Sequence, residues 1–169
     1  MPCDWVCYLI MSISSRETYV GATNNMKQRL SNHNNNNPNI KRKGAKRTRG
    51  KVWVPILVIS GFISKNACLS FESGFKRLCK RRTNKRFDLI NFAYESNLKY
   101  SSDPRDNRIV DLLYFTHNIT TINGKFILNA DYKHPVIQPD PLTANVFMEE
   151  WITELEFPHY FNVKMIDNI

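Results

Sequence analysis

The chain of 169 residues lacks any apolar run close to the roughly 20 residues that a membrane-spanning helix needs. Its N-terminal stretch, MPCDWVCYLIM, contains an acid and no basic segment, so we do not expect a secretion signal. Hydrophobic residues still make up 42% of the chain, enough to build a packed core and to exclude wholesale disorder. We therefore expect a folded intracellular protein of one domain, or one domain with an appendage, and no membrane contact.

Cysteines are also few. The chain has Cys3, Cys7, Cys68 and Cys79, and none of the C-x-x-C pairs that are typical of zinc knuckles. We expect reduced thiols, with Cys7 and Cys68 acting as small core residues. A zinc site formed by the four cysteines is the alternative.

Acidic residues are scarce in the first 100 positions, which hold 19 Lys and Arg against 5 Asp and Glu. Residues 101–169 reverse this balance, with 5 against 10. A basic front and an acidic back predict one face that binds a polyanion. The alternative is a basic face that is only solvated.

Periodicity along the chain predicts an α/β fold. Continuous or alternating apolar runs indicate strands, and apolar residues three and four apart indicate helices. The predicted strands are Trp5–Met11, Thr18–Ala22, Val52–Ile59 and Lys125–Leu128. The predicted helices are Asn24–His33, a long helix from Ser64, Phe87–Phe92, one over Ile109–Leu113, and Val146–Leu155.

Several local details follow from residue type. Thr23 or Asn24 is the expected cap of the first helix, and Pro55 predicts an edge strand or a bulge. The stretches NHNNNNPNI and KRKGAKRTRGK predict a long basic loop, and Ser101–Asn107 predicts a linker. We expect a domain at residues 1–86, with a small mixed or antiparallel sheet flanked by helices, and a mainly helical, acidic extension at residues 87–169.

Five side chains stand out by their type: Tyr8, Tyr19, Arg29, His33 and Glu72. Hydrolysis of a phosphodiester needs a base for water, a cation for the phosphate and an oxygen ligand for a metal, and this set contains all three. Each residue alone has a structural explanation. The two phenols suit core or cross-strand packing, and the cation and carboxylate suit a solvated helix face.

The order and spacing of these residues resemble the GIY-YIG endonuclease superfamily. Val6-Cys7-Tyr8 matches the first motif, Tyr19-Val20-Gly21 the second, and Arg29 and His33 the Arg-x-x-x-His of the following helix. Within that superfamily the chain is most similar to the catalytic subunit of SLX-type structure-selective endonucleases. The supporting stretches are YVGATNNMKQRLSNHN, RTRGK, VWVPILVISGF and ACLSFE.

The sequence departs from that family in three places. The later asparagine of some GIY-YIG enzymes has no clear counterpart, and Asn84 and Asn91 are only weak candidates for it. Val6 stands where the first motif has glycine, and we expect a strand position to tolerate it. The chain has no cysteine beyond Cys79, so the RING-like zinc module of eukaryotic SLX-type subunits is expected to be absent. The dock that this module would offer a scaffold protein is expected to be absent with it.

The resemblance implies a role for each of the five. Tyr8 would act as general base or position the attacking water, and Tyr19 would orient water or phosphate. Arg29 would contact the scissile phosphate, and His33, one helical turn later, would accept the tyrosine proton or bind phosphate. Glu72 would hold one Mg²⁺ or Mn²⁺, since a single carboxylate suits an ion that keeps several waters.

Basic residues around this set are expected to grip DNA by its backbone, without reading sequence. They are Lys27, Lys41, Arg42, Lys43, Lys46, Arg47, Arg49, Lys51, Lys76, Arg77, Lys80 and Arg81. For the arm at 41–51 the alternative is a disordered basic tail or a nuclear-localisation patch.

The resemblance implies a metal-dependent endonuclease of branched duplex DNA, such as flaps, forks or Holliday junctions, in repair and recombination. The alternatives are a GIY-YIG enzyme of another task, lesion incision or homing, and a non-catalytic nucleic-acid-binding protein. A second copy of the chain or a regulatory protein is the expected partner, and the acidic extension either masks the basic face or caps the core. The abundance of Asn, Ile and Lys hints at an AT-rich genome, and the expected location is the nucleus or a cytoplasmic site of viral replication.

Overall fold

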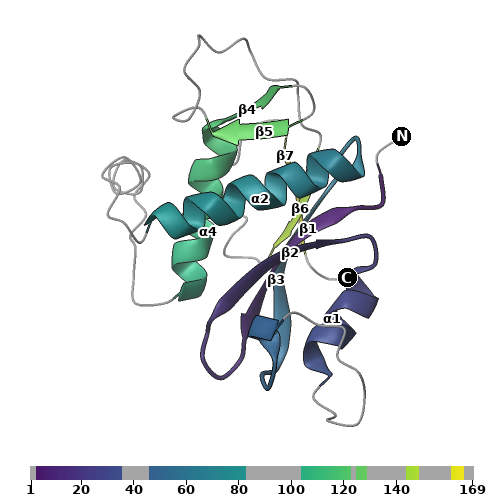
Figure 1. Ribbon diagram of the computed structural model, residues 1–169, viewed down its shortest axis with the longest axis vertical. Helices are drawn as coiled ribbons and strands as arrows, with labels where there is room; N and C mark the ends of the chain where they lie inside the picture. The colour runs from purple at the N-terminus through teal and green to yellow at the C-terminus, as the bar shows by residue number, and fades with distance from the viewer. Residues whose placement is uncertain are drawn as a thin grey trace.

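The computed structural model describes residues 3–35, 46–82, 104–122, 125–128, 144–148 and 161–165. In these residues helices cover both faces of a five-stranded sheet of order β2-β1-β3-β6-β7 (Figure 1). The elements are β1 (Val6–Ser12), β2 (Thr18–Thr23), α1 (Met26–Asn34), the 3₁₀ helix η1 (Lys46–Thr48), β3 (Trp53–Ser60), α2 (Lys65–Arg82), α4 (Pro104–His117), β4 (Ile119–Ile122), β5 (Lys125–Leu128), β6 (Ala144–Met148) and β7 (Phe161–Met165). The predicted α/β class is confirmed.

Strand β1 lies between β2 and β3 and is antiparallel to both. Its register with β3 shifts between Leu9 and Ile10, because Leu9 pairs with Leu57 while Ile10 pairs with Pro55. The extra residue on β3 is a β-bulge, as the proline predicts, since proline cannot donate to the ladder. Helix α2 begins where predicted, and the Ser64 hydroxyl accepts a hydrogen bond from Ala67 N at 3.1 Å.

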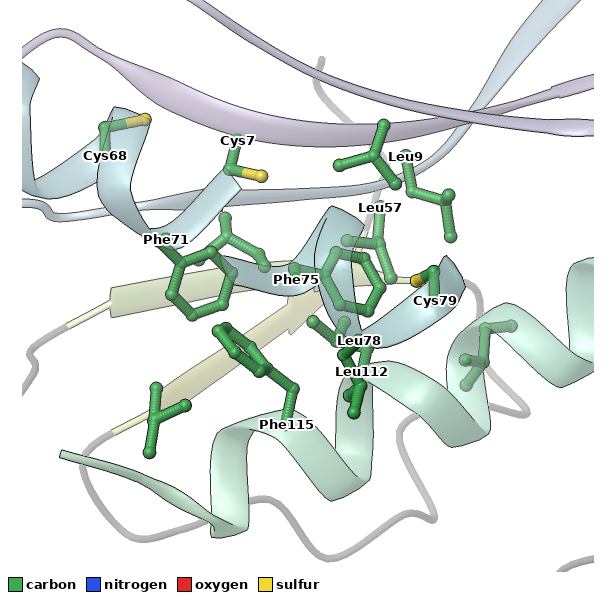
Figure 2. Packing of buried hydrophobic residues seen from close by; sticks show 14 of the residues in the cluster. Cys7, Leu9, Leu57, Cys68, Phe71, Phe75, Leu78, Cys79, Leu112 and Phe115 are labelled. Atoms are coloured by element: carbon green, nitrogen blue, oxygen red, sulfur yellow. The ribbon is translucent and has the colours of Figure 1, made fainter. Parts of the chain in front are cut away.

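The larger core lies on one face of this sheet. Figure 2 shows side chains of α2 between the strands and α4, with Phe71 and Phe75 in the middle. Phe115 of α4 packs on both, at ring-centroid distances of 5.0 and 5.8 Å. Full burial of such side chains stabilises the fold by about 1.5–3 kcal/mol each, so α4 is held to the sheet through α2.

The cysteines belong largely to this core. Cys7 and Cys68 are 1% and 0% exposed, which confirms their interpretation as core residues. Figure 2 shows Cys7 and Cys79 among apolar side chains. All four cysteines are free, and no helix in the described part of the chain is long and apolar enough to cross a membrane.

Three predictions for the C-terminal region are wrong. The extension expected to be mainly helical contains, in its described residues, the helix α4 and the strands β4, β5, β6 and β7. The helix expected at Val146–Leu155 is wrong at its start, because Ala144–Met148 is strand β6, which pairs with β3 and in parallel with β7. The linker expected at Ser101–Asn107 is wrong from Pro104 onward, because α4 begins there with proline in its first turn, where a missing N–H costs nothing. The β4–β5 hairpin packs beside α2, and its second strand is where the sequence predicts it. The helix expected at 87–92 lies outside the described residues, and the domain boundary after residue 86 stays a prediction.

Candidate active site

The Tyr8 hydroxyl is the centre of the site. It lies 2.8 Å from His33 Nε2, and Arg29 Nε donates a hydrogen bond to it at 3.1 Å. Tyr8 is buried completely, at 0% exposure, so its polar atom depends on these two partners. A phenol between an imidazole and a guanidinium has a proton acceptor on one side and a cation on the other.

Strand register gives Tyr8 the room it occupies. Tyr8 pairs directly with Gly21 across the β1–β2 ladder, so both residues face the same side of the sheet. A Cβ placed on Gly21 would lie 2.3 Å from the Tyr8 hydroxyl oxygen and 2.4 Å from Cζ. The glycine therefore makes space for the tyrosine, a role that its place in a Tyr-Val-Gly motif did not reveal.

Helix α1 supplies the two partners of the phenol. Its N-cap is Asn25, whose side chain accepts from Gln28 N at 3.0 Å, so the expected cap at Thr23 or Asn24 is wrong by one or two residues. At the other end, Asn34 exchanges hydrogen bonds with the backbone of Trp53, at 2.9 and 2.7 Å. A helix fixed at both ends holds residues one turn apart, such as 29 and 33, on one face.

A further residue, Thr48, holds the far side of the imidazole. Its hydroxyl lies 2.9 Å from His33 Nδ1, and both residues are buried, at 1% and 2% exposure. The Thr48 carbonyl in turn accepts from Trp53 Nε1 at 2.9 Å. Thr48 was not predicted as a site residue, although it lies in the RTRGK stretch. Its contact with His33 depends on the path of the chain between α1 and β3, which no local pattern predicts.

Burial keeps the phenol and the imidazole uncharged. It raises the pKa of Tyr8 to about 12, against the lowering effect of the Arg29 hydrogen bond and charge. It lowers the pKa of His33 to about 4, in the same direction as the nearby Arg29 charge. At neutral pH Tyr8 therefore keeps its proton, and the ring nitrogen facing it is a suitable acceptor.

Helix α2 reaches the site from the other side, around the edge strand β2. The Lys76 ammonium lies 5.3 Å from the centroid of the Tyr19 ring and donates to Glu72 Oε1 at 2.6 Å. The Tyr19 ring is tilted against His33 at a centroid distance of 5.1 Å. The charge of Glu72 adds to the upward shift of the Tyr8 pKa. Direct contacts thus join four of the predicted catalytic side chains, Tyr8, Tyr19, Arg29 and His33, and Lys76 connects Glu72 to them through Tyr19.

The predicted DNA-binding residues divide into three groups. Lys27, Lys46, Arg47, Arg49, Arg77 and Lys80 are exposed, and Lys76 is half-buried. Lys51 forms an ion pair with Glu17 and lies 6.0 Å from the Trp53 ring centroid, so part of its charge is offset within the fold. Lys41, Arg42, Lys43 and the side chain of Arg81 lie outside the described residues.

Comparison with known proteins agrees with this geometry. Residues 4–86 match the model of the GIY-YIG catalytic domain. An uncharacterized protein, L300, of Acanthamoeba polyphaga mimivirus is 60% identical over 163 residues, which cover 96% of this chain and 97% of that protein.

Shorter matches reach structure-specific endonuclease subunits named SLX1. The subunit of Vanderwaltozyma polyspora is 38% identical over 77 residues, or 45% of this chain and 24% of the subunit. That of Aspergillus terreus is 33% identical over 89 residues, or 50% and 22%. The chain thus spans about a quarter of the length of these two subunits.

Proposed function

Because this chain belongs to the GIY-YIG family, we propose that it is a metal-dependent, structure-specific endonuclease that hydrolyses phosphodiesters in branched DNA. The observation that carries the proposal is the Tyr8 hydroxyl held between His33 Nε2 and Arg29 Nε. The expected substrates are flaps, forks and Holliday junctions, and the products a 5′-phosphate and a 3′-hydroxyl. The task would be DNA repair or recombination.

The hydrogen bonds define a path for the proton of the attacking water. Arg29 Nε donates to the Tyr8 oxygen, and in the His33 tautomer that carries its proton on Nδ1, Tyr8 donates to His33 Nε2 and His33 Nδ1–H donates to Thr48. As Tyr8 would give its proton to His33, its oxygen would take a proton from water, and the water oxygen would attack phosphorus. The bond to the 3′-oxygen would break, and that oxygen would take a proton from solvent, while His33 would return its proton to solvent. Arg29 would stabilise the charge that develops on the phenol and on the phosphate.

The single carboxylate of Glu72 supports the choice of Mg²⁺ or Mn²⁺ in this proposal. No group of three or more His, Cys, Asp or Glu gathers into a metal-binding cluster within the described ranges, so a site built wholly from protein ligands is not found there. Glu72, at 17% side-chain exposure, suits Mg²⁺ or Mn²⁺, which complete their shells with water and substrate oxygens. When bound, the ion would supply positive charge to the phosphate. Lys76 forms an ion pair with this carboxylate, so Glu72 would have to bind Lys76 and the metal ion together.

Recognition by shape fits the basic residues better than recognition by sequence. The exposed cations lie on α1, on η1 and the turn that follows it, and on α2, and charges of this kind contact phosphates rather than base edges. A regulatory protein partner belongs to the same proposal, since the SLX1 relatives are named as subunits. We place the activity inside the infected cell, at a site of viral DNA replication, on the strength of the mimivirus relative.

A cleavage assay tests the proposal directly. Wild-type protein with Mg²⁺ or Mn²⁺ is incubated with flap, fork, junction and linear duplex DNA, alone and with candidate partners. We expect branched substrates to be cut, and Glu72→Gln to lose at least about a hundredfold in rate while still binding DNA. Glu17→Gln, which also removes an ion-paired glutamate, is the matched control and should cleave normally.

Each other outcome has a meaning. Cleavage of linear duplex as fast as branched DNA would overturn the structure-specific assignment in favour of another GIY-YIG task. A wild-type protein that leaves every substrate intact in all of these conditions would be a nucleic-acid-binding protein that keeps the fold.

A further inference from the structure

A basic cavity lies beside the active site, between the edge strand β2 and helices α2 and α4. Its volume is about 430 Å³. The residues that give it its chemistry are Thr18, Tyr19, Arg47, Lys76, Lys80 and Arg108. Its lining includes four cations and no acid, and they come from three separate elements, η1, α2 and α4.

Two of these cations are fixed in place by the fold. Arg108 donates from Nε to the Thr18 hydroxyl at 3.2 Å and from an Nη to Asp111, a carboxylate with 0% exposure, at 3.2 Å. Lys76 is held by Glu72 at 2.6 Å. Because neither carboxylate, Asp111 nor Glu72, lines the cavity, the charged side chains of its wall are all cations.

We propose that this cavity binds a backbone phosphate of the DNA next to the phosphate that is cleaved. The inference rests on the proposed function and adds a second phosphate site to it. Tyr19 and Lys76 line the cavity and also contact active-site residues, so an anion bound here would neighbour the scissile group along one strand. The volume exceeds that of one phosphate and falls in the range of small-molecule sites, which leaves space for the attached sugar.

The cavity gives α4 a part in DNA binding. Arg108 lies outside the segment 4–86 that matches the nuclease domain, yet it forms one wall of the cavity and bonds to β2. The extension that follows the nuclease segment would thus position a strand of DNA as well as cover the core.

The experiment measures binding to flap DNA, with every variant made in the Glu72→Gln background so that no cleavage is needed. Affinity is followed by fluorescence anisotropy between about 50 and 200 mM salt. We expect Lys80→Gln and Arg47→Gln each to weaken binding about fivefold to tenfold and to reduce the salt slope by about 0.9, the value for one lost phosphate contact. Lys65→Gln, at the opposite end of α2, is the matched control and should change neither quantity.

Arg108 needs two variants, because it also pairs with a buried carboxylate. Arg108→Gln should weaken binding as Lys80→Gln does, and Arg108→Lys should restore most of it, with thermal unfolding checked for both. If Arg108→Gln does not fold, the Lys80 and Arg47 variants still decide.

The outcomes separate this inference from the proposed function. If the wild type cleaves DNA but Lys80→Gln and Arg47→Gln bind like Lys65→Gln, the cavity inference is wrong and the nuclease assignment stands. If these variants lose affinity but the wild type cleaves nothing, the cavity inference stands and the nuclease assignment is wrong. Inorganic phosphate and a free mononucleotide are titrated in parallel. If either binds to the cavity while the cavity variants bind flap DNA normally, the cavity is a site for a free phosphate ligand and the proposed site for a DNA backbone phosphate is wrong.

Discussion

Cys7 and Tyr8 are neighbours on β1 and are equally buried, at 1% and 0% exposure, yet they face two different interiors. Cys7 points into the apolar core between the sheet and α2, near Cys68 and Phe71 (Figure 2). Tyr8 points to the α1 side, where its hydroxyl meets an imidazole and a guanidinium.

Burial raises the pKa of both groups, but only Tyr8 has a hydrogen-bond partner that could accept its proton. The pKa of the Cys7 thiol rises well above its usual value, chiefly by burial, so the thiol stays protonated among apolar neighbours. The pKa of Tyr8 rises as well, and its proton has an acceptor 2.8 Å away. Burial alone therefore does not distinguish the two residues; the role proposed for Tyr8 rests on the proton acceptor and the cation at its hydroxyl.

The largest effect should come from removing the hydroxyl of Tyr8. In the proposed mechanism the Tyr8 hydroxyl passes the proton, so we expect Tyr8→Phe to lower the cleavage rate about 10²–10⁴-fold while DNA binding remains. Single-turnover cleavage and anisotropy measure the two quantities. Cys7→Ala, on the other face, should keep the rate per folded molecule. A Tyr8→Phe enzyme within tenfold of wild type would show that the two faces do not differ in this way.

The apolar face should respond in stability instead. Phe71 is 0% exposed and packs on Phe62 and Phe115 at centroid distances of 5.5 and 5.0 Å. We expect Phe71→Ala to lower the free energy of unfolding by about 3–5 kcal/mol through lost transfer energy and a cavity. Denaturant unfolding measures it. Phe71→Leu, with a smaller loss, should keep normal cleavage per folded molecule; a smaller loss in Phe71→Ala than in Phe71→Leu would contradict the core assignment.

Acid should destabilise the polar face through His33. Its pKa is about 4 in the folded protein and near 6.5 in an unfolded chain, so between these values the unfolded state binds more protons. Stability is then fully present above about pH 6.5 and falls as the pH drops towards 4, by up to about 3 kcal/mol. The measurement is denaturant unfolding against pH, compared with His33→Gln, which should lack this part of the dependence. Parallel curves for the two proteins would rule out a neutral buried imidazole.

The smallest effect should come from the residue behind the imidazole. Thr48→Val leaves His33 Nδ1 without its hydroxyl partner, at a cost of about 1–2 kcal/mol, so we expect roughly a tenfold loss of rate. Because Thr48 acts through His33, Thr48→Ser should restore the rate, and NMR of the imidazole nitrogens should show altered tautomer populations only in Thr48→Val. Equal rates in the valine and serine variants would leave Thr48 with a packing role alone.

The sequence predicted most elements of the nuclease part because their signals are local. Apolar runs marked β1, β2 and β3, and the three-and-four spacing from Ala67 to Leu78 marked α2. Strand β6 was missed because Val146, Phe147 and Met148 suit a helix face as well as a strand, and only their pairing with β3 decides between them. The partner of β6, β7, is parallel to it, and parallel strands are not joined by the short turn that marks a hairpin in a sequence.

In the site, too, the sequence predicted local relationships and missed contacts between distant segments. Residues 29 and 33 share a helix face, so sequence spacing could place them together, whereas the contact of Thr48 with His33 depends on the path of a loop. The approach of Lys76 to Tyr19 depends on how α2 crosses the sheet edge. Arg108 lies 90 positions from Thr18, and no local pattern connects them. Residue chemistry was readable from the sequence, but contacts between distant segments were not.

The close approach of Gly21 to Tyr8 makes the two family motifs dependent on each other. A side chain at position 21 is excluded only while an aromatic ring stands at position 8, and that ring fits only while position 21 has no side chain. A side chain added at position 21 alone would clash with Tyr8, and a small residue at position 8 alone would leave a cavity. A lineage in which a small residue replaces the tyrosine at position 8 no longer requires glycine at position 21, so such relatives should show changes at both positions together.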